Sequence, residues 1–278
     1  MTNFFSVIVP NLNHGEYLSD CLNSILKQNY KKFEIIILDG GSTDNSLKII
    51  KNFANKNESI TYWHSKKDDG QANAINLGIK LAKGNWITWQ NADDLFYTNN
   101  ALNLMNKYIN LNSEKKLFVG NMNLISRSNK IIKKLKYIKP NFSSLLYEGM
   151  TLSNQCSFWH KSLTKDLGYL KNYDVDFDYE WYLRILYKYP NCGFHINKTI
   201  ASFRIHQYQK THKKNSQQIN RIKKIKLSYG KSTNPFFIFI FKYFLLTKRT
   251  LYYLSIFEFS YVILGLFNNI FSYFKKKK

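Results

Sequence analysis

The stretch Phe33-Glu34-Ile35-Ile36-Ile37-Leu38-Asp39-Gly40-Gly41 is an apolar run that ends at a carboxylate followed by two glycines. Short apolar runs of this kind are typical of strands that are buried on both faces of a parallel sheet. The glycines let the backbone turn and approach a ligand closely. Ser42 and Asp44 offer caps for a helix that follows. We therefore predict a strand over residues 33–38 that leads, through Asp39, into a helix.

The same unit recurs on both sides of this stretch. A strand over 5–9 precedes it, and the apolar spacing of Leu18, Cys21, Leu22, Ile25 and Leu26 predicts the helix between them. After it come a strand over 60–64, a helix over 72–82 that Gly84 is expected to cap, and a strand over 86–89. This order predicts an α/β fold with an open, mostly parallel sheet and helices on both faces. Ligands of such sheets bind beyond the carboxyl ends of the strands, where both Asp39 and the Asp93-Asp94 pair fall.

The rest of the chain is less regular. We expect strands near 117–125 and 131–137, a segment around Gln155, and a helix over about 178–189. After Pro235 the chain contains two aromatic-rich apolar runs, 236–246 and 251–267, and it closes on Lys275 to Lys278. Neither run is a convincing membrane span, which needs about 20 apolar residues. The pattern favours amphipathic helices that lie on an anionic membrane surface, with a true membrane span and an interface with a partner as the alternatives.

Composition narrows the classes of function. Hydrophobic residues make up 44% of the 278 residues, which excludes a disordered chain. Lys and Arg outnumber Asp and Glu by 41 to 18, a net charge of +23, so the protein should have a polyanionic neighbour. The basic residues gather near the apolar tail and not on an aromatic platform, so we expect no nucleic acid. Cys21, Cys156 and Cys192 form no Cys-x-x-Cys pair, and no signal peptide is visible, so we expect reduced thiols in the cytoplasm.

Acidic residues at two of the strand ends can hold a charged ligand. Asp93 and Asp94, in Asn91-Ala92-Asp93-Asp94, supply oxygen ligands for a divalent cation, although the same residues also favour plain turns. Asp39 can accept a hydrogen bond from a nucleobase or a ribose, or it can simply cap the turn. Asp68, Gly70 and Gln71 lie at the next strand-to-helix junction, where backbone N–H groups attract anions.

A second group of polar residues lies late in the chain. Asp176, Asp178 and Glu180 precede a helix, where one of them could act as a general base or all could simply favour the helix N-terminus. The neighbouring Trp181 has the spacing of a core residue. Arg204 and His206 lie together in a strand-like stretch, which allows a diphosphate contact, although a lone histidine is more often structural.

Five segments, in this order, resemble the motifs of family 2 glycosyltransferases of the GT-A fold. They are Ser6-Val7-Ile8-Val9-Pro10-Asn11-Leu12-Asn13 with Asp39-Gly40-Gly41-Ser42-Thr43-Asp44, then Asp68-x-Gly70-Gln71, Asn91-Ala92-Asp93-Asp94, Phe177-Asp178-Tyr179-Glu180-Trp181 and Arg204-x-His206. The resemblance covers about residues 4–210. It departs from the family at Phe177, which replaces the first acid of the base motif, and at Asn73, where many members carry Asp.

The resemblance implies a role for each matched residue. Asp94 would be the metal ligand, Asp178 the catalytic base, and Glu180 only an acid at the helix start. The donor would be bound by Pro10, Asn13, Asp39, Asp68, Gly70, Gln71, Asp93, Arg204 and His206, with Asp39 on the base and Asp93 on the ribose. Gln155 and Trp181 would lie at the acceptor site.

We therefore predict an inverting glycosyltransferase that uses Mn²⁺ or Mg²⁺. It would move one sugar from a nucleotide-sugar donor, with a UDP-sugar expected before dTDP- and GDP-sugars, to a saccharide or lipid-linked acceptor in surface polysaccharide or glycolipid synthesis. Residues 1–112 would bind the donor, 113–232 the acceptor, and 233–278 the cytoplasmic face of the plasma membrane. A nucleotidyltransferase and an inactive sugar-nucleotide-binding relative are the alternatives, and the first should carry a Gly-rich basic loop that Pro10 to Gly15 lacks.

Overall fold

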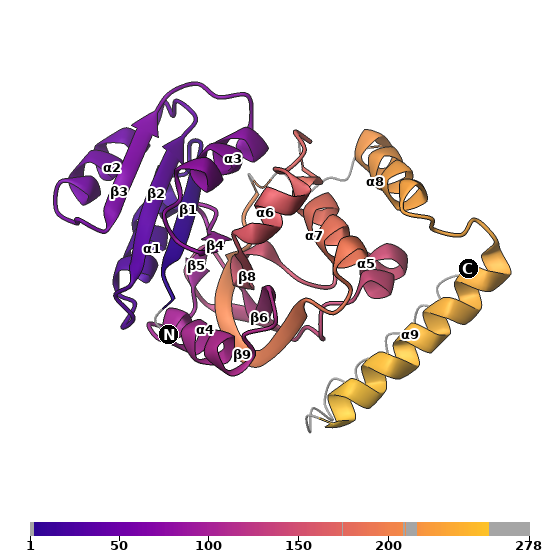
Figure 1. The fold of residues 1–278 in the computed structure, drawn as a ribbon. Helices are drawn as coiled ribbons and strands as arrows, with labels where there is room; N and C mark the ends of the chain where they lie inside the picture. The colour runs from indigo at the N-terminus through magenta and orange to yellow at the C-terminus, as the bar shows by residue number, and fades with distance from the viewer. Residues whose placement is uncertain (1–2, 174, 208, 210–215, 256–278) are drawn as a thin grey trace.

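The computed structural model describes residues 3–173, 175–207, 209 and 216–255. Strands and helices alternate over the first ninety residues, as the sequence predicts (Figure 1). The elements of this part are β1 (Phe5–Asn11), α1 (Gly15–Leu26), β2 (Phe33–Asp39), α2 (Ser46–Ala54), β3 (Ile60–Ser65), α3 (Gln71–Leu81) and β4 (Trp86–Trp89). The predicted strands and helices are therefore present, with bounds that differ by one or two residues at most ends.

The remaining elements form the second half of the same sheet and the helices around it. They are β5 (Leu95–Phe96), α4 (Ala101–Leu111), β6 (Leu117–Ile125), β7 (Ile131–Leu135), α5 (Phe142–Glu148), the 3₁₀ turn η1 (Asn154–Cys156), β8 (Ser157–His160), α6 (Ser162–Leu167), α7 (Phe177–Lys188) and β9 (Gly193–Arg204). Two further helices follow, α8 (Ser216–Ser228) and α9 (Pro235–Ser255).

One sheet runs through the molecule in the order β3-β2-β1-β4-β8-β6-β9-β5, with β7 paired to β6. The strands β3, β2, β1 and β4 are parallel, whereas β8 is antiparallel to both β4 and β6. The curled sheet carries helices on both faces, which confirms the predicted α/β class (Figure 1). The sheet is fully parallel only in its first half, because β8 enters it in the opposite direction.

Burial explains why the central strands are apolar throughout. Every residue of β1 and of β2 is buried, and α3 packs directly against both strands. On α3, Gly78 allows the closest approach, since a Cβ atom there would lie 2.6 Å from a side-chain atom of Ile8. The helix can therefore lie directly on β1, and this contact sets the height of its N-terminus above the strand ends.

The role that we predict for Gly84 as a helix cap is wrong. The C-cap of α3 is Ala82, and Gly84 lies two residues beyond it. A Cβ atom at Gly84 would lie 2.7 Å from the carbonyl oxygen of Phe4, so this position needs glycine for close packing. The Gly84 N–H donates to Ser6 Oγ (2.9 Å), and the buried carboxylate of Glu34 accepts from the same region of backbone.

The C-terminal part of the described chain is helical. Helix α9 covers the first apolar run and the beginning of the second, while most of the second run and Lys275 to Lys278 lie outside the described residues. None of the described helices is long and apolar enough to cross a lipid bilayer. The division of the chain at residues 112 and 232 stays a prediction.

Candidate active site

A cavity of about 390 Å³ opens at the carboxyl ends of the parallel strands. Six of the predicted donor-binding residues line it: Pro10, Asn13, Asp68, Gly70, Gln71 and Asp93. The cavity is also lined by residues for which we predicted no role, namely Leu12, His14, Ala74, Phe203 and Gln209. Parallel strands end at one edge of the sheet, so residues far apart in the sequence meet there.

Asp39 lies directly behind this cavity and is fully buried. Its carboxylate accepts hydrogen bonds from Asn11 Nδ2 (2.5 Å), Ser42 Oγ (2.5 Å), the Ser42 N–H (3.0 Å) and Ser65 Oγ (2.6 Å). Burial by itself would raise the pKa of Asp39, but these hydrogen bonds outweigh it and lower the pKa below its ordinary value. Asp39 thus ties together the ends of β1, β2 and β3. Its predicted contact with the nucleobase stays a prediction.

The junction before α3 forms one wall of the cavity. Gly70 adopts a φ of +106°, which favours glycine, and its N–H donates to Asp68 Oδ1 (2.9 Å). Gln71 begins α3 and donates from Nε2 to Asn91 Oδ1 (2.8 Å). The free N–H groups of a helix N-terminus therefore face the same cavity as the acidic loop after β4.

Asp94, the predicted metal ligand, is fully buried and hydrogen-bonded within the protein. It accepts from Gln155 Nε2 (2.7 Å), the Arg204 N–H (3.0 Å) and Asn91 Nδ2 (3.1 Å). Burial, and then the neighbouring charge of Asp93, raise its pKa well above the ordinary value. This carboxylate connects the loop after β4 to β9 and to η1. Its role as a metal ligand stays a prediction.

Arg204, at the end of β9, is also fully buried. Its guanidinium donates to the carbonyl oxygens of Asp93 (2.9 Å) and Arg127 (2.8 Å) and to Asp20 Oδ2 (3.2 Å). It also lies over the ring of Tyr17, 4.7 Å from the ring centroid. In this arrangement Arg204 supports the acidic loop from behind, and its predicted contact with the donor stays a prediction.

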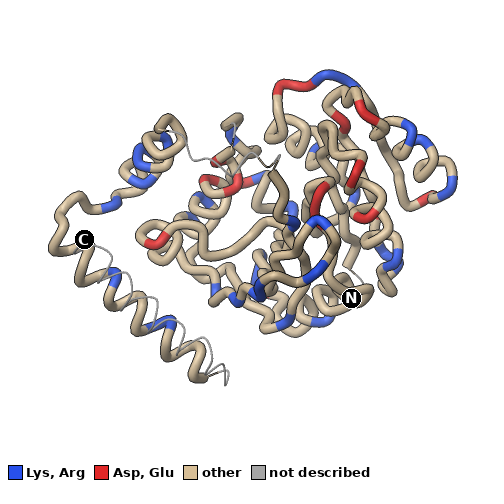
Figure 2. Tube along the Cα trace, turned by 180° about the vertical axis from the view of Figure 1, so that it is seen from behind, with Lys and Arg blue, Asp and Glu red and all other residues tan. Residues whose placement is uncertain are grey.

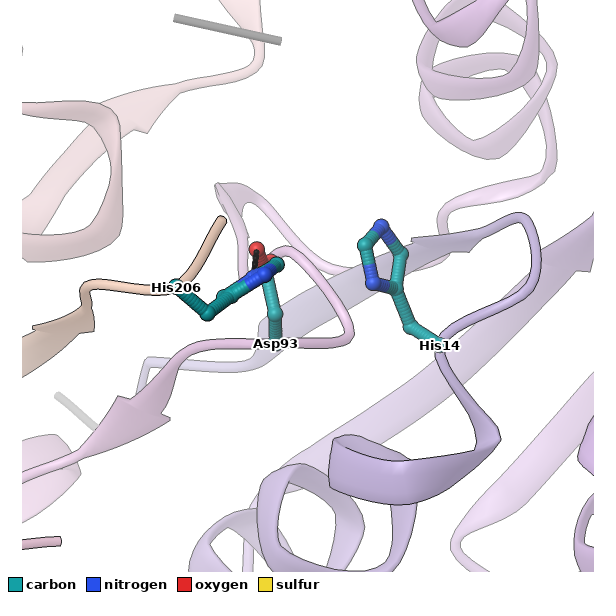
Figure 3. Close-up of side chains that lie close together, drawn as sticks. All are labelled: His14, Asp93 and His206. Atoms are coloured by element: carbon teal, nitrogen blue, oxygen red, sulfur yellow. Dashed lines mark hydrogen bonds and ion pairs between the residues drawn. The ribbon is translucent and has the colours of Figure 1, made fainter. Parts of the chain in front are cut away.

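Three side chains offer ligand atoms for a metal ion at the rim of the cavity: His14, Asp93 and His206. Their ligand atoms all lie within 4.8 Å of one another. Asp93 and His206 face each other, with His206 Nε2 2.9 Å from Asp93 Oδ2, and the ring centroid of His14 lies 5.8 Å from that of His206 (Figure 3). Within the described residues, the buried Nδ1 of His206 has no hydrogen-bond partner. Together with one carboxylate, the two imidazoles fit a transition-metal ion such as Mn²⁺ better than Mg²⁺, which prefers oxygen ligands.

His14 is the candidate ligand that the sequence did not indicate. It stands between Asn13 and Gly15, immediately before α1, and a lone histidine in a loop carries no chemical signature of its own. Only the turn from β1 into α1 brings it to Asp93, which lies after β4. A prediction that β1 and β4 pair in parallel could therefore have placed His14 near Asp93.

The predicted base, Asp178, lies in the first turn of α7 and is not among the residues that line the cavity. Its neighbour Phe177 packs against Trp89, the last residue of β4, with ring centroids 6.3 Å apart. Burial, and to a smaller extent the charge of Asp176, raise the pKa of Asp178 to about 6. A carboxyl group with this pKa can accept a proton near neutral pH.

Two neighbours of Asp178 differ from their predicted roles. Glu180, predicted as a simple helix-start acid, is 1% exposed and contacts Arg184 Nη2 (3.0 Å), Lys171 Nζ (3.1 Å) and Tyr229 Oη (3.0 Å). It is a buried anchor, which the pattern of alternate acids could not reveal. Trp181 is fully buried against Trp159, so in this structure it has no exposed surface with which to contact an acceptor. Gln155 links the two halves, since it bonds to Asp94 and accepts from Gln90 Nε2 (2.6 Å).

Comparison with known proteins gives one family. The family model described as "Glycosyl transferase family 2" matches residues 6–167. Glycosyltransferase GlyG of Streptococcus pneumoniae is 42% identical over 99 residues, which are 36% of this chain and 33% of that protein. The chain thus spans about a third of the length of this curated relative.

Solved structures share the fold at low sequence identity. The S. aureus TarS 1–349 structure in complex with UDP-GlcNAc superposes with a TM-score of 0.67 at 18% identity, covering 81% of this chain and 66% of that one. The mannosyltransferase PcManGT from Pyrobaculum calidifontis, in complex with GDP-Man and Mn²⁺, gives a TM-score of 0.55 at 15% identity over 98% of this chain and 88% of that one. At these identities the likeness concerns the fold.

Proposed function

Because this chain belongs to glycosyl transferase family 2, we propose that it moves one sugar from a nucleotide-sugar donor to the hydroxyl group of an acceptor. The observation that carries this proposal is the cavity at the carboxyl ends of β1, β2 and β4. The N-terminus of α3, which suits a diphosphate, lies at this cavity. So does the carboxylate of Asp93, which is close to His14 and His206. A UDP-sugar is the donor that we expect first.

The donor would lie across the strand ends, with its diphosphate between the N-terminus of α3 and the acidic loop. Asp68 and Gln71 flank this position, and Asn13 lies at the mouth of the same cavity. The carboxylate of Asp39 is already fixed by hydrogen bonds, and the nucleobase of the donor would bind next to it. Asp93 and His206 would hold a divalent ion, with His14 as a third ligand. When bound, such an ion supplies positive charge that stabilises the departing diphosphate.

Asp178 would accept the proton of the acceptor hydroxyl while that oxygen attacks the anomeric carbon of the sugar. A base on the side of the sugar opposite the diphosphate requires in-line attack, so the product would have the inverted configuration. The position of Asp178 supports this role, because Phe177 packs on the end of β4, the strand that leads into the acidic loop. Its pKa of about 6 also suits a general base at neutral pH.

A panel of nucleotide sugars tests the proposal directly. We expect that the protein with Mn²⁺ and one donor of the panel releases nucleotide, and that adding the correct acceptor increases the rate and gives a product of inverted configuration. NMR of the anomeric proton of the product checks the configuration. A retained configuration would exclude the role of Asp178, and an absence of release with UDP-, GDP- and dTDP-sugars would contradict the proposed function.

We further propose that α9 lies on an anionic membrane surface at the cytoplasmic face, where it would bring the site to a lipid-linked acceptor used in surface polysaccharide or glycolipid synthesis. One side of α9 packs on the body of the protein, through Leu245 and through an ion pair between Arg249 and Glu148. Its outer side exposes large apolar residues, with exposed fractions of 72% for Phe236, 70% for Phe239 and 67% for Tyr243.

Charge supports this orientation of α9. Lysines and arginines recur along α8 and α9, whereas most Asp and Glu residues lie in the other half of the molecule (Figure 2). Lys242 and Lys248 flank the exposed apolar side, an arrangement that suits the boundary between acyl chains and anionic headgroups.

Vesicle co-sedimentation tests the membrane proposal. Phe239→Ser with Tyr243→Ser should reduce binding to vesicles that contain phosphatidylglycerol, and high salt should release only part of the wild-type protein. The control, Leu111→Ser with Leu81→Ser, removes exposed apolar side chains from α4 and α3 and should bind like the wild type. Equal binding by both double variants would contradict the proposal.

A further inference from the structure

Helix α8 packs one side on the first turn of α7, which carries Asp178. The inner side of α8 includes the buried residues Gln218 and Ile225, whereas Lys223 and Lys224 on its outer side are exposed. The two helices are separated in the sequence by the whole of β9. Their contact is therefore tertiary, and it lies beside the predicted base.

Two side chains of α8 hold the carboxylate of Asp176, the N-cap residue of α7. Gln218 Nε2 donates to Asp176 Oδ1 (3.0 Å), and Arg221 Nη1 lies 3.5 Å from Asp176 Oδ2. Gln218 and Arg221 are three residues apart, so they project from the same side of the helix. Asp176 is 3% exposed, and a carboxylate at this depth needs such partners in order to remain ionised.

The same side of the C-terminal segment also contacts the residues that follow Asp178. The Lys226 ammonium group lies over the ring of Tyr179, 5.6 Å from the ring centroid. Just after α8, Tyr229 Oη donates to Glu180 Oε1 (3.0 Å). Residues that precede and follow Asp178 in the sequence are thus contacted by α8 and by Tyr229, which comes just after it.

We propose that α8 is a positioning element for Asp178, and that Gln218 and Arg221 act by holding the Asp176 carboxylate beside it. The inference rests on the proposed function only for the statement that Asp178 takes the proton of the acceptor. The placement of Asp176 by α8, and its electrostatic effect on Asp178, can be measured without any substrate.

The charges around this turn determine in which direction each substitution should move the pKa of Asp178. Among the described residues, the charged or titratable groups around the turn include Asp176 itself, Arg221 and Lys226 from α8, Lys171 from the preceding loop, and Glu180, Tyr182 and Arg184 from α7. After burial, the negative charge of Asp176 is the remaining cause that raises the pKa of Asp178 to about 6. Removing the charge of Asp176 should lower the pKa of Asp178. Removing Arg221, which offsets that charge, should raise it.

Titration of the full-length protein tests this directly. The carboxyl carbon of Asp178 can be followed by NMR in protein labelled with ¹³C-aspartate, and its signal can be assigned from its loss in Asp178→Asn. We expect the pKa of Asp178 to fall in Asp176→Asn and to rise in Arg221→Gln, each by about 0.5 pH unit or more. The matched control is Lys223→Gln, which removes one positive charge from the exposed side of the same helix and should leave the pKa unchanged.

Shifts of the Asp178 pKa in opposite directions distinguish positioning by α8 from a general loosening of the structure. A variant that only disturbed the packing would move the pKa of Asp178 in the same direction at both positions, or not at all, and either result overturns the proposal. If Arg221→Gln does not fold, the test rests on Asp176→Asn and Asp176→Ser. An unchanged pKa of Asp178 in both variants contradicts the inference.

Kinetics supply the second readout. In transfer assays at saturating substrates, the acid limb of the kcat profile should move with the pKa in the same two variants, while KM for the donor stays constant. If the wild-type protein transfers no sugar, the proposed function fails while the titration still decides the present inference. If the wild type is active and the acid limb stays in place in both variants, α8 does not position the base.

Discussion

Two regions, the donor corner around the buried Asp39 and the base corner around the half-buried Asp178, place an aspartate in opposite environments. At the donor corner, Asp39 accepts four hydrogen bonds from Asn11, Ser42 and Ser65, and its pKa is lowered. At the base corner, Asp178 accepts from the adjacent Tyr179 N–H (2.7 Å) and lies near a second carboxylate, and its pKa is raised to about 6. The first carboxylate is a fixed acceptor, and the second can exchange a proton.

The difference follows from how each corner is built. The partners of Asp39 lie at the ends of β1 and β3 and in the turn after β2, so the sheet itself brings them together. The surroundings of Asp178 come from β4, α7 and α8, three elements that are far apart in the sequence. Hydrogen bonds stabilise the ionised form of a carboxyl group, whereas burial and a like charge oppose it. The proposed transfer needs both environments, one to hold the donor and one to take up a proton.

The comparison predicts that substitution of Asp178 causes the largest loss of transfer activity. Asp178→Asn keeps the shape of the side chain but cannot accept a proton, so transfer should fall by about 10²–10⁴-fold. Donor affinity should stay near the wild-type value, because the donor corner is unchanged. Transfer kinetics and calorimetric titration of the donor measure the two effects, and Asp166→Asn, on the exposed surface of α6, is the control. A comparable loss of donor affinity would mean that the two corners are not separate.

Removal of the metal should act on the donor corner alone. We expect excess EDTA or Asp93→Ala to reduce turnover by about 10³-fold, since a bound ion contributes several kcal/mol to stabilising the leaving group. Added Mn²⁺ should restore the activity of the EDTA-treated wild type but not that of the variant. Asp69→Ala, which removes an exposed carboxylate near the cavity, should keep full activity. Unchanged turnover in excess EDTA would rule out a metal at His14, Asp93 and His206.

Glu180 should affect stability and not chemistry. Glu180→Gln leaves Arg184 and Lys171 next to a neutral side chain, and we expect a loss of about 1–3 kcal/mol in the free energy of unfolding. Chemical denaturation measures this loss against Glu58→Gln, an exposed glutamate on the opposite half of the molecule. At a temperature where the variant is folded, kcat should fall by less than tenfold. A Glu180→Gln protein that folds fully but is inactive would place the base at Glu180 instead.

The smallest effect concerns pH. The base must be ionised to accept a proton, so the fraction of competent enzyme declines as pH falls through the pKa of Asp178, about 6. Below that value kcat should drop about tenfold per pH unit. The pKa of Asp39 is lowered, so donor binding measured without metal should not change over the same range. Parallel profiles of kcat and of donor affinity between pH 5 and 8 would contradict the proposed division between the two corners.

Much of the donor corner could be read from the sequence, because its signals are local. Apolar runs that end at Asp39 and at Asn91-Ala92-Asp93-Asp94 mark the carboxyl ends of buried strands, and such ends meet at one edge of a parallel sheet. The family resemblance and the fold class follow from the same segments, and both are confirmed. Motif residues such as Asp68, Gly70 and Gln71 then fall in the cavity, because short turns connect them rigidly to the strands.

Tertiary structure alone decided which of these side chains face the cavity and which support others. Asp94 and Arg204 are fully buried and bonded to protein atoms, and His14 joins Asp93 from a separate loop. Glu180 and Trp181 belong to the interior, and α8 returns from beyond β9 to hold the turn of Asp178. Periodicity reports which side of an element is apolar, but not which distant element covers it. The burial, pairing and protonation of a carboxyl group depend on that covering element, so they cannot be read from the residues next to it.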